Sequence, residues 1–167
     1  MADRDFSGAA RTAGVCHHGA TMATNYRLFH CRPEDVFAVL ADGWNYAAWV
    51  VGTSRIRGVD ETWPAPGAKL HHSFGLWPAL VDDITVMVAW DPPRHAILKA
   101  RGWPLGEASV RFDVREHPRG CVVRMGEDAA AGPMAKIPAA LRQPGIRFRN
   151  SETLRRLAFL AEGRARS

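Results

Sequence analysis

The sequence predicts an α+β fold in which a run of antiparallel strands precedes one long C-terminal helix. Hydrophobic and polar residues alternate at period two between residues 54 and 127, a pattern typical of half-buried strands. Residues 146–161 carry an apolar stripe at helical spacing instead. The chain has 167 residues, 47% of them apolar, which suffices for one sizeable core but not for two typical domains.

The first ordered elements are one strand and two short helices. Alternation predicts a strand over residues 24–30, after a leader at 1–21 that shows no periodicity. Pro33 suits the first turn of a helix, where its missing N–H costs nothing, and Gly43 ends that helix. Residues 44–50 predict a second, short helical segment.

Six further strands follow, each separated from the next by a turn rich in Pro or Gly. They are predicted near residues 54–62, 68–76, 82–90, 95–102, 107–115 and 121–127. The connections are too short for crossover helices, so neighbouring strands run antiparallel. A parallel, nucleotide-binding sheet is therefore excluded.

The last element is a helix with one apolar face. We expect Pro138 and Pro144 to interrupt the chain before this helix. Its stripe consists of Ile146, Asn150, Thr153, Leu154, Leu157, Leu160 and Ala161. We expect one ligand-binding domain over residues 22–163 and a basic tail at 164–167.

This order of elements resembles the START-like, or SRPBCC, superfamily and its polyketide cyclase/dehydrase-like members. The segments that carry the resemblance are residues 33–42 (PEDVFAVLAD), Trp49, Pro66-Gly67, residues 91–94 (DPPR) and residues 149–157 (RNSETLRRL). The resemblance implies the helix-grip fold, a curved seven-stranded antiparallel sheet wrapped around the C-terminal helix, with two short helices after the first strand. It also implies a cavity for a polyketide-, aromatic- or lipid-like molecule between sheet and helix, but no single reaction.

Three ionisable residues are candidates for chemistry in such a cavity. If the sheet curves around the helix, the more apolar phase of each strand faces inward. This rule places His72, Asp82 and Glu127 inside, where they are candidate acid–base residues. Each also has a structural interpretation, because strand-end carboxylates are often solvated and a core histidine is often satisfied by its neighbours. The catalytic residues therefore remain unknown at this point.

The expected ligand-binding residues come from the inward phase of the strands, from the short helical segment and from the last helix. Tryptophan and tyrosine rings offer large apolar areas with one polar group each, which suits a cavity for a flat molecule. The set is Trp44, Tyr46, Trp49, Leu70, His72, Phe74, Val86, Val88, Leu98, Val110, Phe112, Met125 and Phe148.

Neither a metal nor an organic cofactor is expected. Cys16, Cys31 and Cys121 lack a CxxC spacing, and His71 and His72 face opposite sides of a strand. Glycine-rich nucleotide-binding motifs are missing as well. With neither a secretory signal nor an apolar stretch of bilayer length, the sequence favours a cytoplasmic protein without a transmembrane segment.

Two alternatives to simple ligand binding stay open. One is a polyketide cyclase- or aromatase-type enzyme that uses the cavity acids and His72. The other rests on residues 141–167, a segment that contains seven arginines and only two glutamates. Such a segment can contact an anionic membrane surface or a partner. We expect no nucleic-acid partner, because the arginines lack the interleaving with aromatic and glycine residues that is typical of a nucleic-acid groove.

Overall fold

The structure is a computed structural model that describes residues 23–102, 106–131 and 139–166. The described residues form one antiparallel sheet of seven strands in the order β1-β7-β6-β5-β4-β3-β2. The strands are β1 (Ala23–Phe29), β2 (Thr53–Val59), β3 (Lys69–Leu76), β4 (Ala79–Asp91), β5 (His95–Gly102), β6 (Gly106–His117) and β7 (Gly120–Ala131). Only β1 departs from sequence order, because it pairs with β7 while β2 forms the opposite edge.

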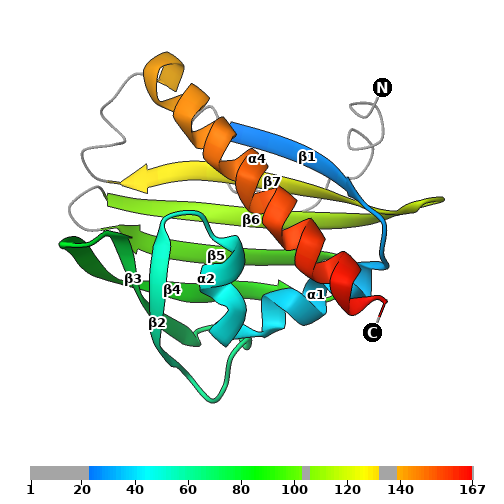
Figure 1. Ribbon diagram of the computed structural model, residues 1–167, viewed down its shortest axis with the longest axis horizontal. Helices are drawn as coiled ribbons and strands as arrows, with labels where there is room; N and C mark the ends of the chain where they lie inside the picture. The colour runs from blue at the N-terminus through cyan, green and yellow to red at the C-terminus, as the bar shows by residue number, and fades with distance from the viewer. Residues whose placement is uncertain (1–22, 103–105, 132–138, 167) are drawn as a thin grey trace, which may run out of the picture.

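The helices of the described chain lie on one face of this sheet (Figure 1). Helix α1 (Pro33–Ala41) follows β1, and a 3₁₀ turn η1 (Gly43–Asn45) leads into the single turn of α2 (Tyr46–Trp49). Helix α4 (Ala139–Arg164) crosses the sheet diagonally and contacts β1, α1 and α2. This arrangement confirms the predicted helix-grip fold.

Local chemistry explains where the short helices begin. Pro33 is the first residue of α1, and the Asp35 carboxylate accepts a hydrogen bond from the backbone N–H of Arg32 at 2.9 Å. The Asp42 side chain then accepts from the backbone N–H of Asn45 and starts η1. These caps fix the direction in which α2 approaches the sheet.

Helix α4 begins earlier than the sequence predicted. The two prolines were expected to precede it, yet the helix starts at Ala139 and contains Pro144. A proline inside a helix cannot donate to the carbonyl four residues before it, and its ring crowds that carbonyl, yet the helix continues through Pro144. Pro138 lies outside the described residues.

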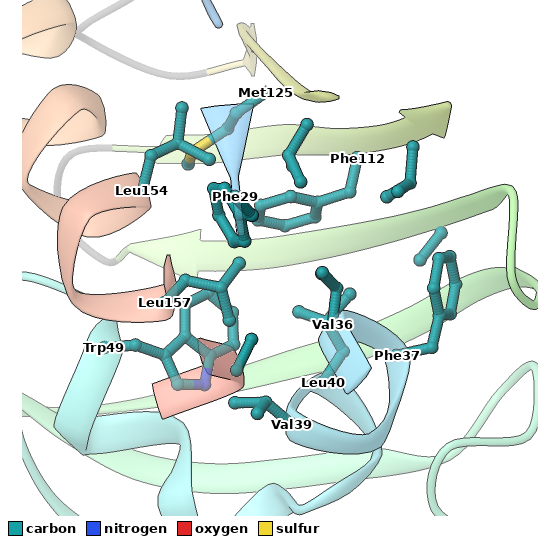
Figure 2. Packing of buried hydrophobic residues seen from close by; sticks show 14 of the residues in the cluster. Phe29, Val36, Phe37, Val39, Leu40, Trp49, Phe112, Met125, Leu154 and Leu157 are labelled. Carbon is teal, nitrogen blue, oxygen red and sulfur yellow. The ribbon is translucent and has the colours of Figure 1, made fainter. Parts of the chain in front are cut away.

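The hydrophobic core fills the space between the sheet, α1 and the second half of α4. Figure 2 shows Leu154 and Leu157 of α4 pointing toward the rings of Phe29, Phe112 and Trp49. Both leucines are at most 1% exposed. Burial of these apolar side chains holds α4 against the sheet.

Strand β4 turns a different set of side chains inward than the sequence predicted. The more apolar phase, with Asp82, Val86 and Val88, was expected to face the helix. In the structure Asp83, Thr85 and Met87 are buried, whereas Asp82 and Val88 are exposed and Val86 is half-buried. The prediction was wrong here because two of these three inward residues, Asp83 and Thr85, are polar, so the apolar phase of the strand is not its inner face.

None of the helices in the described part of the chain is long and apolar enough to span a bilayer.

Candidate ligand-binding site

A pocket of about 190 Å³ lies between the inner face of the sheet, α2 and the first half of α4. For scale, a dry cavity of about 150 Å³ is large enough to hold benzene. The lining residues are Tyr46, Trp49, Val50, Val51, Thr53, His72, Phe74, Asp83, Leu98, Ala100, Glu107, Ala108, Val110, Phe112, Met125, Glu127, Ile146, Arg149, Asn150 and Thr153. Most of them are apolar, and the polar ones are concentrated on two walls.

The first polar wall is a chain of hydrogen bonds that joins α2 to strands β3 and β4. The hydroxyl oxygen of Thr85 lies 3.1 Å from the phenol oxygen of Tyr46 and 3.1 Å from Nε2 of His72. Oδ2 of Asp83 lies 3.8 Å from the same His72 nitrogen. All four side chains are buried, so the wall is shielded from bulk water.

Burial sets the protonation of this wall. It lowers the pKa of His72 to about 4, helped by electrostatic repulsion from Arg57 and His71. It raises the pKa of Tyr46 to about 12, although the hydrogen bond between Tyr46 and Thr85 lowers this pKa. Burial also raises the pKa of Asp83, although the backbone N–H of Ile84 donates to its carboxylate. At neutral pH His72 and Tyr46 are therefore uncharged.

Aromatic rings form the floor of the pocket. The rings of Tyr46 and Trp49 meet edge to face with centroids 5.1 Å apart, and Trp49 meets Phe112 in the same manner at 5.9 Å. Edge-to-face contact is a favourable arrangement for such rings. Because these rings hold one another in place, they present a fixed apolar surface.

The second polar wall links strand β7 to helix α4. Nη2 of Arg149 donates to Oε1 of Glu127, whose side chain is buried. Asn150, the next residue on α4, is fully buried and also lines the pocket. Thr153 lies one turn further on and its hydroxyl accepts from the backbone N–H of Val51 at 3.4 Å. The helix thus contributes polar groups directly to the pocket.

A third carboxylate, Glu107, lies at the edge of the lining. Lys99 and Arg101 contact it at 2.6 and 3.3 Å, and the hydrogen bond from Lys99 lowers its pKa. The side chains of all three are partly exposed to solvent. This cluster belongs to the rim rather than to the enclosed part of the pocket.

The structure brings most of the predicted site residues together. The predicted residues that line the pocket are Tyr46, Trp49, His72, Phe74, Leu98, Val110, Phe112, Met125 and Glu127. Leu70 is fully buried in the core but does not line the pocket. His72 and Glu127, two of the three candidate acid–base residues, lie on the two polar walls.

The remaining predicted residues lie elsewhere. Asp82 is on the outer face of the sheet, where Ser73 donates to it at 2.8 Å and Arg57 lies 3.3 Å away. Val86 and Val88 share that strand and do not reach the pocket. Trp44, in η1, is 65% exposed and does not line the pocket.

Phe148 is likewise outside, with 79% of its side chain exposed. The helical spacing already implies this, because two residues turn a helix by about 200°. Ile146 faces the pocket, so Phe148 points to the opposite side. Its assignment to the ligand-binding set was wrong for this reason.

Six polar lining residues were not among the predicted site residues, namely Thr53, Asp83, Glu107, Arg149, Asn150 and Thr153. Asn150 and Thr153 were on the predicted inner stripe of the last helix, so a signal for them existed. Asp83 was missed because the apolar-phase rule selected its neighbour. Arg149 was assigned to the basic segment and to the segment 149–157 that carries the family resemblance, but not to the pocket.

The described residues hold no group of three or more His, Cys, Asp or Glu side chains that could bind a metal ion. Cys31 and Cys121 are buried and free. Cys16, in the predicted leader, lies outside the described residues.

Comparisons with known proteins agree with this architecture. A protein-family model described as polyketide cyclase / dehydrase and lipid transport matches residues 23–162. No curated protein shows significant sequence similarity to the chain.

Solved structures share its fold. A protein from Rhodobacter sphaeroides is 21% identical, with a TM-score of 0.66 over 85% of this chain and 93% of that one. A protein from Chromobacterium violaceum is 16% identical, with a TM-score of 0.65 over 84% and 97%. The di-domain ARO/CYC BexL from the BE-7585A biosynthetic pathway is 17% identical, with a TM-score of 0.64 over 87% of this chain and 50% of that one. At such identities the likeness concerns the fold alone.

Proposed function

We propose that this chain, which belongs to the polyketide cyclase / dehydrase and lipid transport family, binds one small, mainly hydrophobic molecule in the pocket between the sheet and helix α4. The observation that carries the proposal is the pocket itself. Aromatic and aliphatic side chains line most of it, and a few polar groups converge on two of its walls. Pockets of this kind are typical of sites for small apolar ligands.

The energetics support the same function. An empty apolar space costs stability, since the side chains around it lose contacts. A ligand that fills the space restores these contacts and stabilises the folded state by RT ln(1 + [L]/Kd). Trp49 lies in the lining, so its fluorescence reports on an occupant.

The test is a panel of flat aromatic and aliphatic compounds, scored by quenching of tryptophan emission and by the melting temperature. We expect some compounds to change both. Ala100→Phe places a ring in the pocket and should abolish both effects. Val88→Phe, on the exposed face of β4, is the matched control and should bind like the wild type. The proposal fails if no compound acts on the wild type, or if Ala100→Phe binds equally well.

A second candidate function, catalysis in the same pocket, is favoured by the chain of hydrogen bonds from Tyr46 through Thr85 to His72. His72 is unprotonated at neutral pH and can accept a proton from the α-carbon of a bound ketone. The C–H electrons then form the enolate, which Tyr46 can stabilise by hydrogen bonding.

Enolisation can be tested without knowing the natural substrate. A ketone such as 2-tetralone, incubated in D₂O, exchanges its α-hydrogens for deuterium each time the enolate forms and is reprotonated. The wild type should accelerate this exchange over buffer, and His72→Gln should remove the acceleration. His117→Gln, at the end of β6, is the control that should keep it. Exchange at the buffer rate with the wild type contradicts an enolising function and leaves ligand binding standing.

A further inference from the structure

Several polar atoms of the pocket lining have no hydrogen-bond partner among the described residues. They are Nε1 of Trp49, Nδ1 of His72, Oε2 of Glu127, and both Oδ1 and Nδ2 of Asn150. Each atom is buried, and the side chains come from four different elements, α2, β3, β7 and α4. Buried polar groups without partners are costly, so protein interiors rarely keep them.

Asn150 is the clearest case. Its side chain is 0% exposed, and both ends of its amide are unpartnered within the described part of the chain. Asn150 is a polar residue on the mainly apolar stripe by which α4 contacts the sheet. A leucine at this position would suit the core, so the amide costs stability unless something binds it.

The unpartnered atoms differ in what they require. The Trp49 and Asn150 N–H groups need an acceptor, whereas Oδ1 of Asn150 and Oε2 of Glu127 need a donor. A hydroxyl group supplies both functions. A carboxylate supplies acceptors only, so it leaves the Glu127 oxygen unsatisfied.

Charge points in the same direction. The lining contains three acidic side chains, Asp83, Glu107 and Glu127, and one permanently charged base, Arg149. Arg149 is already bound to Glu127. An anionic ligand would therefore approach carboxylates and find no unpaired cation in the enclosed part of the described pocket.

We propose that the pocket recognises a neutral, hydroxyl-bearing aromatic molecule through Asn150, Glu127 and Trp49, and that it rejects carboxylates of the same shape. This inference rests on the proposed ligand-binding function and names the chemical class of the ligand. Glu127 accepts from the ligand hydroxyl, and Asn150 or Trp49 donates to it.

Four naphthalene probes separate the effects of shape, hydrogen bonding and charge, with dissociation constants measured by NMR chemical shifts at pH 7. 2-Naphthol should bind about tenfold more tightly than 2-methylnaphthalene, which has the same shape but no polar hydrogen. 2-Naphthamide should bind at least about tenfold more tightly than 2-naphthoate, which is of equal size but charged.

Three variants assign these preferences to residues. Asn150→Leu should bring the affinity for 2-naphthol close to that for 2-methylnaphthalene. Glu127→Gln should strengthen the binding of 2-naphthoate, a gain that a damaged fold cannot produce. Asn45→Ala, at an exposed asparagine outside the pocket, should change neither ratio.

The outcomes distinguish this inference from the function on which it rests. Equal binding of 2-naphthol and 2-methylnaphthalene, or of 2-naphthoate and 2-naphthamide, overturns the inference while the pocket remains a ligand site. An absence of binding by all four probes overturns the proposed function as well.

Discussion

The hydroxyl oxygen of Thr85 lies 3.1 Å from Nε2 of His72, and both side chains are buried. Thr85 also contacts the phenol of Tyr46, so one hydroxyl serves two buried polar groups. It is thus the central member of the polar wall, although it does not line the pocket itself.

Replacing Thr85 by valine tests this role. The two side chains have similar shapes, but valine leaves the Tyr46 hydroxyl and His72 without their partner. We expect the free energy of unfolding to fall by about 1–3 kcal/mol in denaturant titrations. Thr62→Val, at an exposed turn, is the control and should change it by less than about 0.5 kcal/mol. Equal effects of the two substitutions would show that the wall contributes no stability.

The pH dependence of stability should reflect the low pKa of His72. Its pKa is about 4 in the folded protein and about 6.5 when unfolded. The unfolded chain therefore binds an extra proton between these values, and stability falls as the pH is lowered from 6.5 toward 4. At pH 5 this one group lowers the stability by about 2 kcal/mol relative to pH 7.

Asp83 opposes this effect, because its raised pKa makes the folded state bind protons more readily in acid. The comparison is therefore made between the wild type and His72→Gln, with denaturant titrations at pH 5 and 7. The variant should lose less stability on acidification than the wild type. An NMR titration that gives His72 a pKa near 6.5, or equal losses in both proteins, would contradict the buried, neutral histidine.

The packing of helix α4 predicts unequal effects for two large side chains only two residues apart. Leu157 is 0% exposed, whereas Phe159 is 73% exposed. Leu157→Ala should lower the free energy of unfolding by about 2–5 kcal/mol, because it leaves a cavity under the helix. Phe159→Ala should cost less than about 0.5 kcal/mol. Loss of less than about 0.5 kcal/mol at Leu157 would show that α4 does not pack on the sheet in this way.

We predict that the outer face of α4 contacts an anionic bilayer. Phe148 and Phe159 are exposed there, and the exposed side chains of Arg147 and Arg155 lie on or beside the same stripe. Exposed aromatic rings flanked by arginines suit the interface of an anionic membrane. The wild type should sediment with phosphatidylserine-containing vesicles at low salt, and high salt should release it.

The double variant Phe148→Ser/Phe159→Ser keeps every charge and should bind these vesicles several-fold less. Trp77→Ser, an exposed ring outside α4, is the control and should bind like the wild type. Vesicle binding that survives the double variant contradicts this assignment of the face. A shift from dimer to monomer on gel filtration, caused by the same variant, would identify it as a protein interface instead.

The fold could be predicted from the sequence because each element carries its own local signal. Pro33 marks the start of α1, and the stripe that contains Leu154 and Leu157 marks the inner face of α4. Turn residues such as Trp77-Pro78 separate the strands. Antiparallel pairing then follows from the short connections.

The polar part of the pocket was harder to predict, because polar lining breaks the rule that the apolar phase faces inward. A register argument would have found Asp83. If Trp77 and Pro78 are the two turn residues, Leu76 pairs with Ala79 and His72 pairs with Asp83, as observed. Directly paired residues share one face of a sheet, so an inward His72 requires an inward Asp83. The hydrogen bonds of Thr85 and the unpartnered amide of Asn150 need the three-dimensional structure.

The central claim, that the pocket holds a small hydrophobic molecule, is tested most directly by what the purified protein carries. Wild type and Ala100→Phe are purified in parallel, extracted with organic solvent and analysed by mass spectrometry. We predict a recurrent hydrophobic compound in the wild-type extract that is depleted from the Ala100→Phe extract. A compound present in equal amounts in both extracts, or none in repeated wild-type preparations that also fail to bind any probe, would contradict the claim.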